Sequence, residues 1–392
     1  VATNGTSNID TTGFVGLTSA KVIAAGTADS TLTASGTTNV DLTVSGNARA
    51  LVLGGKSINV KSGGNDVTVG IAGAAATSAA AITDVTITGG GVTFIDNTGG
   101  ALGITTSTGT TLKTVTLNGM AGAGATISGA AVDTINLNNQ TTALATTVTN
   151  ATSTALTINA TNAGVAAVAF TPVAGVTFAA GTAATSVTVN SLGVANNIQV
   201  GGGAVTALNL NGSANLTLTN QTVAAAATIT STGAGNRTLS TTLATDTKYV
   251  GSTGVDTVSF AATTVASSLG GGDDVATITA AITGANASVD GGAGADTISV
   301  AATLAGALSA TAVFNSKVSG FEKVAIGAID TTALAAQVLA IDAANLDGID
   351  LPAFRIAKDP AALLAERQAF VCHQIGRLAR HAVGNQIGRA GD

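Results

Sequence analysis

The stretch Val132-Asp133-Thr134-Ile135-Asn136-Leu137-Asn138 carries the pattern that decides the fold: an apolar residue, two spacers, and then two apolar residues that alternate with Asn. Alternation with period two predicts a β-strand, and Thr, Val and Ile favour that conformation. The pattern recurs, and its copies close at positions 88, 118, 138, 159, 190 and 211. Steps of 20 or 21 residues, with excursions of 30 and 31, predict a parallel β-solenoid with occasional longer loops.

Less regular forms of the same sequence pattern occur in the first 80 residues, for example at residues 40–46 and 50–55. Asn recurs at the end of the strand copies, where a turn is expected because Asn tolerates positive φ. Two interpretations remain open. The Asn side chains stack into a hydrogen-bonded ladder inside the solenoid, or Asn is simply a common turn residue.

Composition indicates a core of many small apolar side chains. Charged residues make up 9% and aromatic residues 3%, whereas Gly numbers 50. The 45% hydrophobic content argues against simple disorder, which needs low hydrophobicity and high net charge. Because 21 Asp and Glu outnumber 15 Lys and Arg, nucleic acid is not expected as a partner. No stretch predicts a membrane-spanning helix.

A glycine-rich motif points to calcium. Gly291-Gly292-Ala293-Gly294-Ala295-Asp296-Thr297-Ile298-Ser299 matches the nonapeptide G-G-x-G-x-D-x-U-x at every fixed position. Residues 251–259 replace its second Gly, and residues 269–277 replace its first Gly and place a small residue at U. Glycines allow a tight turn with carbonyls facing inward, Asp adds the hard oxygen that calcium prefers, and U points into the roll. The candidate metal-site residues are Gly251, Gly254, Asp256, Gly270, Gly272, Asp273, Asp274, Gly291, Gly292, Gly294 and Asp296.

The spacing and surroundings of these copies fit a calcium roll. Turns on one side of such a roll lie two nonapeptides apart, which agrees with the 18 residues from Asp256 to Asp274. The 22 residues from Asp274 to Asp296 predict a bulge or a different site. Residues 241–350 hold eleven Asp and Glu against three Lys. Chance occurrence in a Gly-rich chain is the alternative, and Asp273 and Asp290 are equally compatible with solvated turn positions.

The three nonapeptides, the Thr/Ala/Gly/Asn-rich strand repeats and residues 318–324 (VSGFEKV) resemble the RTX-type proteins that bacteria export by type I secretion. More narrowly, they resemble the S-layer proteins of Caulobacter-like bacteria, over about residues 1–350. The resemblance implies a Ca²⁺-rigidified β-solenoid that forms a lattice outside the outer membrane, with other copies of the chain and outer-membrane polysaccharide as partners. It also implies a helical N-terminal anchoring domain, which this sequence does not display, and a C-terminal secretion signal.

The last residues differ from the rest of the chain in composition and charge. Residues 351–392 hold six Lys and Arg against three Asp and Glu, and Asp359-Pro360 predicts the start of a helix. Cys372 and His373 are neighbours that would diverge on a helix, so no metal or nucleophilic site is expected there. The tail is interpreted as a secretion signal or as an unrelated, frameshifted end. The single Cys excludes an internal disulfide.

The sequence predicts an all-β chain in four parts: a solenoid over 1–245, a calcium-binding β-roll over 246–325, a connection over 326–350 and a short helical tail over 351–392. The chain opens on Val1 without a Sec-type signal, which suggests a processed form, a fragment or another export route. Before residue 350 there is no His or Cys and a single Glu, so catalysis is not expected. The predicted function is a secreted, self-assembling S-layer component, with an RTX adhesin or matrix protein as the alternative.

Overall fold

The computed structural model shows an all-β protein. It describes residues 2–3, 7–26, 30–46, 50–61, 67–69, 84–88, 104–106, 112–119, 125–129, 131–140, 144–150, 152–164, 174–178, 183–219, 221–282, 284–301, 304–305, 316–327 and 355–356. Within these residues the strands pair in parallel and form sheets of 15, 12 and 4 strands. The predicted all-β, parallel solenoid is therefore confirmed.

The odd-numbered strands form the 15-stranded sheet, which we call the odd wall. Its strands are β1 (Ala2–Thr3), β3 (Ser19–Gly26), β5 (Asn39–Gly46), β7 (Ser57–Lys61), β9 (Asp84–Thr88), β11 (Thr114–Asn118), β13 (Thr134–Asn138), β15 (Ala155–Thr161), β17 (Ser186–Leu192), β19 (Ala207–Asn211), β21 (Thr228–Ser231), β23 (Lys248–Val250), β25 (Ala266–Ser268), β27 (Ser288–Asp290) and β29 (Val318–Ser319). The six predicted strand copies are all in this wall, as β9 to β19.

The even-numbered strands, together with β31, form the even wall, in two sheets. The first sheet holds β2 (Ser7–Asp10), β4 (Ser30–Ala34), β6 (Ala50–Gly54) and β8 (Val67–Val69). The second holds β10 (Ile104–Thr106), β12 (Ala125–Gly129), β14 (Leu144–Thr149), β16 (Ala174–Phe178), β18 (Asn196–Gly201), β20 (Leu216–Leu218), β22 (Arg237–Leu239), β24 (Asp256–Phe260), β26 (Val275–Ile278), β28 (Thr297–Val300), β30 (Lys323–Ile326) and β31 (Arg355–Ile356).

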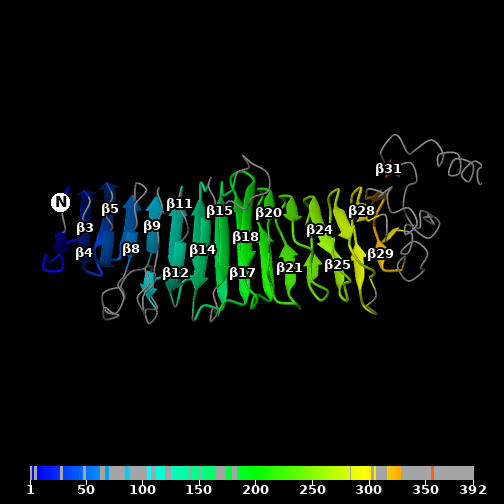
Figure 1. The fold of residues 1–392 in the computed structure, drawn as a ribbon, viewed down its shortest axis with the longest axis horizontal. Coiled ribbons are helices and arrows are strands. Elements are labelled where there is room, and N and C mark those ends of the chain that lie inside the picture. Colours follow the sequence, from blue (N-terminus) through cyan, green and yellow to red (C-terminus); the bar gives the residue numbers. More distant parts are fainter. Residues whose placement is uncertain are drawn as a thin grey trace, which may run out of the picture.

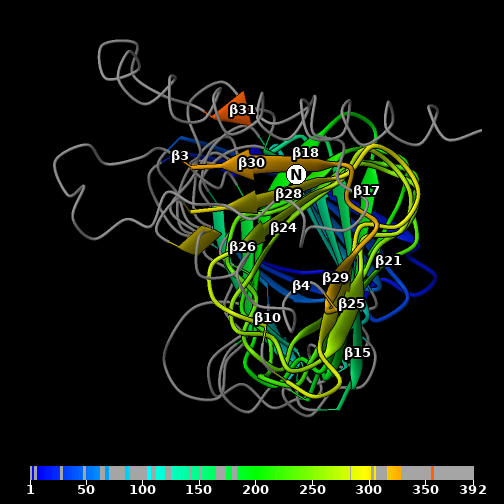
Figure 2. The same ribbon diagram turned by 90° about the vertical axis from the view of Figure 1, so that its right-hand side faces the viewer.

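From β1 to β30, consecutive strands lie in opposite walls, so the chain winds as a solenoid in which each coil adds one strand to each wall. Figure 1 shows the coils stacked side by side along the long axis, with the strands lying across it. Figure 2 looks along the stack and shows the two walls enclosing a narrow interior. Each coil therefore contacts mainly its two neighbours, as in other repeat proteins.

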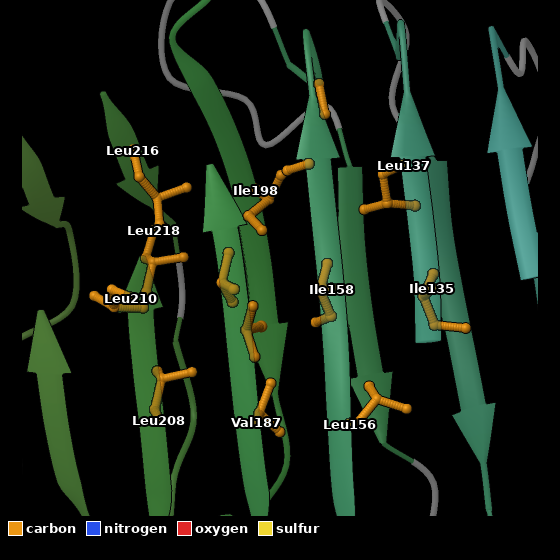
Figure 3. Packing of buried hydrophobic residues seen from close by; sticks show 14 of the residues in the cluster. Ile135, Leu137, Leu156, Ile158, Val187, Ile198, Leu208, Leu210, Leu216 and Leu218 are labelled. Atoms are coloured by element: carbon orange, nitrogen blue, oxygen red, sulfur yellow. The ribbon is translucent and has the colours of Figure 1, made fainter. Parts of the chain in front are cut away.

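The interior consists of aligned columns of aliphatic side chains. Along the odd wall, Val115, Ile135, Ile158, Val189 and Leu210 are register partners in successive coils, and all five are fully buried. Figure 3 shows the buried side chains of neighbouring coils pointing into the space between the walls. Burial of one such side chain is worth about 1.5–3 kcal/mol, so this stacking supplies the main stabilising term.

The recurrent Asn residues form a ladder, but on the outer face of the odd wall. The Asn190 side-chain amide donates to Asn159 Oδ1 at 2.7 Å, and that of Asn159 donates to Asn136 Oδ1 at 2.8 Å. Asn136 in turn donates to Thr116 Oγ1 at 2.9 Å. Of the two open interpretations, the ladder is present for Asn159 and Asn190, which it joins to Asn136, but it lies on the outside of the solenoid and not inside it. Asn alternates with buried Ile and Leu, and period-two alternation turns it outward.

The two walls continue through the boundary expected near residue 245, since β21 pairs with β23 and β22 with β24. In the tail only Arg355–Ile356 is described, as a short strand paired with β30. The helix expected from Asp359 onward lies outside the described residues, as do Cys372 and His373. Among the parts of the chain that the structure describes, no helix is long and apolar enough to cross a membrane.

Candidate metal centre

A column of charged side chains lies inside the even wall near its C-terminal end, at or just before the first residues of β22, β24, β26 and β28. Arg237 is the register partner of Asp256. The registers of the next strands align Asp256 with Asp274, Asp274 with Asp296, and Asp296 with Glu322. The three Asp predicted from the nonapeptides thus occupy one position in three successive coils.

Hydrogen bonds connect these carboxylates into a ladder. The backbone N–H of Asp256 donates to Asp274 Oδ1, and that of Asp274 donates to Asp296 Oδ1, each at 2.7 Å. The backbone N–H of Asp296 donates to Glu322 Oε2, also at 2.7 Å. Asp274, Asp296 and Glu322 therefore each accept a bond from the coil before, whereas the Asp256 side chain accepts none. We call Asp256, Asp274, Asp296 and Glu322 the carboxylate ladder.

The three Asp side chains of the ladder are fully buried, yet part of their hydrogen-bonding capacity is unused. Both carboxylate oxygens of Asp256, and Oδ2 of Asp274 and of Asp296, have no hydrogen-bond partner. Buried carboxylate oxygens without a partner carry a large desolvation cost unless a cation or proton is supplied. These oxygens are the strongest indication in the molecule of a missing positive charge.

The turns before each Asp need glycine because they pack directly onto the turn of the preceding coil. Gly272 and Gly294 have φ of 131° and 147°, a region that side chains rarely adopt. A Cβ at Gly294 would lie 1.7 Å from the carbonyl oxygen of Gly272, and one at Gly272 would lie 2.7 Å from that of Gly254. The spacing of the nonapeptide glycines therefore follows from turn-on-turn contact.

The first glycine of the motif leaves room for the carboxylate itself. A Cβ at Gly251 would lie 2.5 Å from Asp256 Oδ2, and one at Gly291 would lie 2.9 Å from Asp296 Oδ2. A larger residue at either position would fill the space that the acidic side chain occupies. Gly270 and Gly292 complete these turns with φ of 99° and 101°.

The irregular step from Asp274 to Asp296 does not break the ladder. Its additional residues lie at the opposite corner, where residues 279–287 connect β26 to β27, whereas residues 261–265 make the same connection one coil earlier. The expected bulge is present, and it leaves Asp296 in register with Asp274. The number of residues between motifs is thus set by the other corner of the coil.

Burial changes the acidity of the ladder. It raises the pKa of Asp256 from 3.8 to about 6, although the nearby Tyr249 hydroxyl and Arg237 guanidinium oppose the shift. It raises the pKa of Asp274 to about 7, with the charges of Asp256 and Asp296 adding to the effect. Burial also raises the pKa of Asp296; the hydrogen bond from the Asp274 N–H and the Lys323 charge oppose this shift, whereas the charges of Glu322 and Asp273 add to it. Unit charges about 5 Å apart repel by about 3 kcal/mol at an effective dielectric constant of about 20.

Basic side chains lie at both ends of the ladder. The Arg237 guanidinium is fully buried and donates to backbone carbonyl oxygens. At the other end, Lys323 Nζ donates to the carbonyl oxygen of Ala295 at 2.7 Å. Tyr249, from the odd wall, completes the group with a buried hydroxyl that has no hydrogen-bond partner of normal geometry.

Two acidic candidates lie apart from the buried column. Asp273 is exposed, and its Oδ1 accepts the backbone N–H of Ala295 at 3.0 Å. Asp290 is half-buried, and its Oδ1 accepts the Ser319 hydroxyl at 2.9 Å. Both connect neighbouring coils, Asp273 from a turn and Asp290 from the end of β27. Oxygen atoms of Asp273 are nevertheless close enough to the ladder to raise the pKa of Asp296.

Three residues of this region were not identified as site residues from the sequence: Arg237, Tyr249 and Glu322. Residues 232–240 keep two glycines and the U position of the nonapeptide but carry Arg where Asp is expected. The nonapeptide pattern, with any residue allowed at the Asp position, therefore matches this turn and identifies Arg237. Glu322 follows Gly320 in the segment of residues 318–324, and only its register with Asp296 identifies it. No sequence signal distinguishes Tyr249.

The ladder suits a hard cation in charge and in ligand type, since it offers buried, unpartnered carboxylate oxygens. Side chains alone do not complete a coordination shell: among the described residues, no three His, Cys, Asp or Glu side chains gather around one point. Backbone carbonyls of the glycine turns would therefore have to supply further ligands. Calcium accepts such mixed oxygen sets of six to eight ligands.

Comparison with known proteins adds no assignment. No protein-family model matches the chain, and no curated protein matches it either. The class of protein is therefore defined by the fold alone, as a parallel β-solenoid with an internal carboxylate ladder.

Proposed function

We propose that the chain is a secreted structural protein of a bacterial cell surface, a calcium-dependent component of a self-assembling S-layer. The observation that carries the proposal is the set of unpartnered oxygens on Asp256, Asp274 and Asp296, which are fully buried in consecutive coils. Calcium at this ladder would neutralise the repulsion between the coils and make the C-terminal part of the rod rigid.

Calcium control also suits export. At low calcium the ladder carries uncompensated charge, so its coils would remain unfolded, and external calcium would then fold them. A long stack of coils with parallel walls offers repeated lateral surfaces to other copies of the chain. Outer-membrane polysaccharide is the proposed anchor partner.

The proposal includes no catalytic role. The carboxylates of the ladder bond to backbone N–H groups inside the solenoid, where a substrate would have to displace coil-to-coil contacts. The sequence supplies no His or Cys before residue 350 that could act beside them. These features favour a structural role for the ladder.

An adhesin is the second candidate, and one feature favours it. The turn after β2 exposes Phe14 and Val15, whose side chains are 66% and 102% exposed. Apolar side chains presented on a turn near one end of the rod are available to a partner.

Electron microscopy of the purified protein, with millimolar calcium and again with a chelator, tests the proposal. Ordered sheets that dissolve on chelation are expected. Separate rods that fold with calcium but form no lattice would favour the adhesin. Particles that are indifferent to calcium would refute calcium-dependent assembly.

A further inference from the structure

Arg237 occupies the Asp position of a glycine turn built like the later ones. A Cβ at Gly235 would lie 2.3 Å from the carbonyl oxygen of Ala214, and one at Gly254 would lie 2.4 Å from that of Gly235. The two turns therefore stack with the same close contact, one coil apart. Arg237 enters the interior at the position that Asp256 takes in the next coil.

The guanidinium binds the carbonyl groups of two successive turns. Its Nη2 donates to the carbonyl oxygen of Gly212 at 2.7 Å, and its Nη1 donates to those of Ala214 at 3.0 Å and Asn236 at 3.2 Å. Backbone carbonyls of adjacent glycine turns are also the additional ligands that a calcium ion in the carboxylate ladder would need. The Arg237 side chain thus supplies the positive charge that the carbonyl oxygens of these two turns bind.

The same positive charge faces the start of the ladder. Asp256 is the register partner of Arg237, and neither of its carboxylate oxygens accepts a hydrogen bond. On the far side of Arg237 the column continues with Leu216, which is buried and neutral. Arg237 therefore separates neutral coils from charged ones.

We propose that Arg237 is a built-in cation that takes the place of a metal ion in its own turn and so marks the last coil, in chain order, that is stable without calcium. The turns at 212–215 and 233–236 are fastened by the guanidinium, whereas the turns that follow depend on an external cation. Only the dependence of the later turns on an external cation rests on the proposed calcium binding.

Calcium stoichiometry tests whether the guanidinium and a metal ion are equivalent. Arg237→Asp converts residues 232–240 into a nonapeptide with Asp at its usual place, so it is expected to bind about one more calcium ion per chain than the unmodified protein. Arg237→Leu, which copies the residue one coil earlier, is the matched control and is expected to bind no additional ion. Equilibrium dialysis with calcium gives the count.

Amide hydrogen exchange in the presence of a chelator tests the fastening role independently of calcium. In the unmodified protein, turns 212–215 and 233–236 are expected to keep their protection, whereas turns 252–255, 270–273 and 292–295 lose theirs. Arg237→Leu is expected to speed exchange in the first two turns at least tenfold, and Arg237→Lys is expected to restore part of the protection.

The outcomes separate the two ideas. Arg237→Asp that folds and binds no additional ion, while the unmodified protein binds calcium, would overturn the equivalence of Arg237 and a metal. Equal exchange rates in Arg237→Leu and in the unmodified protein would overturn the fastening role. If Arg237→Asp does not fold, this comparison of exchange rates is the test of the proposal. Failure of the unmodified protein to bind calcium would refute the proposed function, and the exchange comparison would still decide the role of Arg237.

Discussion

Polar side chains join neighbouring coils in two regions of the solenoid, but the ladder around β13 to β17 differs in chemistry from the ladder around β24 to β28. In the first region, Asn159 both donates to Asn136 and accepts from Asn190, so the ladder satisfies itself. In the second region, the Asp274 carboxylate accepts a backbone N–H, but the side chain has no donor to offer to the next carboxylate. An amide carries both a donor and an acceptor, whereas a carboxylate only accepts. The neutral ladder is complete by itself, whereas the carboxylate ladder keeps unpartnered oxygens that a cation or a proton would neutralise.

Removal of calcium is expected to have the largest effect and to act on one region only. A chelator should unfold the coils from about residue 251 to residue 327, because the carboxylates of the ladder lose their counter-charge. The coils of the Asn ladder should remain folded. Limited proteolysis followed by mass spectrometry of the protected fragment is the measurement. Equal cleavage of the two regions would contradict the expectation that only the coils of the carboxylate ladder depend on calcium.

Replacement of one acidic rung should convert the carboxylate ladder toward the neutral type. Asp274→Asn keeps an acceptor for the Asp256 N–H, adds a donor and removes one charge. We expect at least tenfold weaker calcium affinity and a more stable metal-free protein. Calcium titration and urea unfolding measure the two effects. The control is Asp246→Asn, which removes an exposed charge and should change neither.

The metal-free protein should become less stable as the pH rises. Burial raises the pKa of Asp256 to about 6 and that of Asp274 to about 7 in the folded chain, so the folded state binds protons more tightly than the unfolded state. Their favourable contribution is complete below pH 4 and is lost between about pH 4 and pH 7. Urea unfolding at pH 5 and pH 8 with a chelator tests this sign. Saturating calcium should reduce the loss, because it binds the ionised carboxylates.

The reverse substitution in the neutral ladder should cost a smaller, calcium-independent amount. Asn159→Asp loses the donor to Asn136 Oδ1 and places a negative charge beside that oxygen. We expect a loss of about 1–2 kcal/mol in the free energy of unfolding, measured with urea. Thr154→Asp adds the same charge at an exposed turn position of the same coil and should have little effect. Rescue of Asn159→Asp by calcium would show that the two ladders are interchangeable.

The smallest effect is expected at Tyr249. Its buried hydroxyl lies beside Asp256 and lowers the pKa of that carboxyl, but it makes no hydrogen bond of normal geometry, so Tyr249→Phe removes an incompletely satisfied polar group and keeps the ring. We expect the metal-free protein to gain about 1 kcal/mol or less. A loss of more than that amount, or a change in calcium affinity, would assign the hydroxyl to the metal centre.

Much of the odd wall could be predicted from the sequence because its strands alternate strictly. Ile135 and Leu137 alternate with Asn, and the structure buries both. The same rule, applied to Asn136, would have placed the Asn ladder outside. Some strands of the even wall, such as β18 (Asn196–Gly201), were not identified, because they do not repeat the longer pattern of the odd-wall copies, although Ile198 and Val200 also alternate with polar residues.

The candidate site was only partly visible in the sequence. The nonapeptides identified Asp256, Asp274 and Asp296, since tight glycine turns impose a fixed spacing on the residue that follows. Arg237 was missed because the motif requires Asp at its position, and Glu322 was missed because its turn lacks most of the glycines. Register between coils, which depends on every corner of the solenoid, is needed to place both residues in the column.

The most direct test of the central claim is a calorimetric calcium titration of the metal-free protein at pH 8, beside a triple variant with Asp256→Asn, Asp274→Asn and Asp296→Asn. The carboxylate ladder predicts saturable calcium binding that increases β-structure in the unmodified protein and is absent from the variant. Identical titrations of the two proteins, or no binding by the unmodified protein, would contradict the assignment of the ladder as a calcium site.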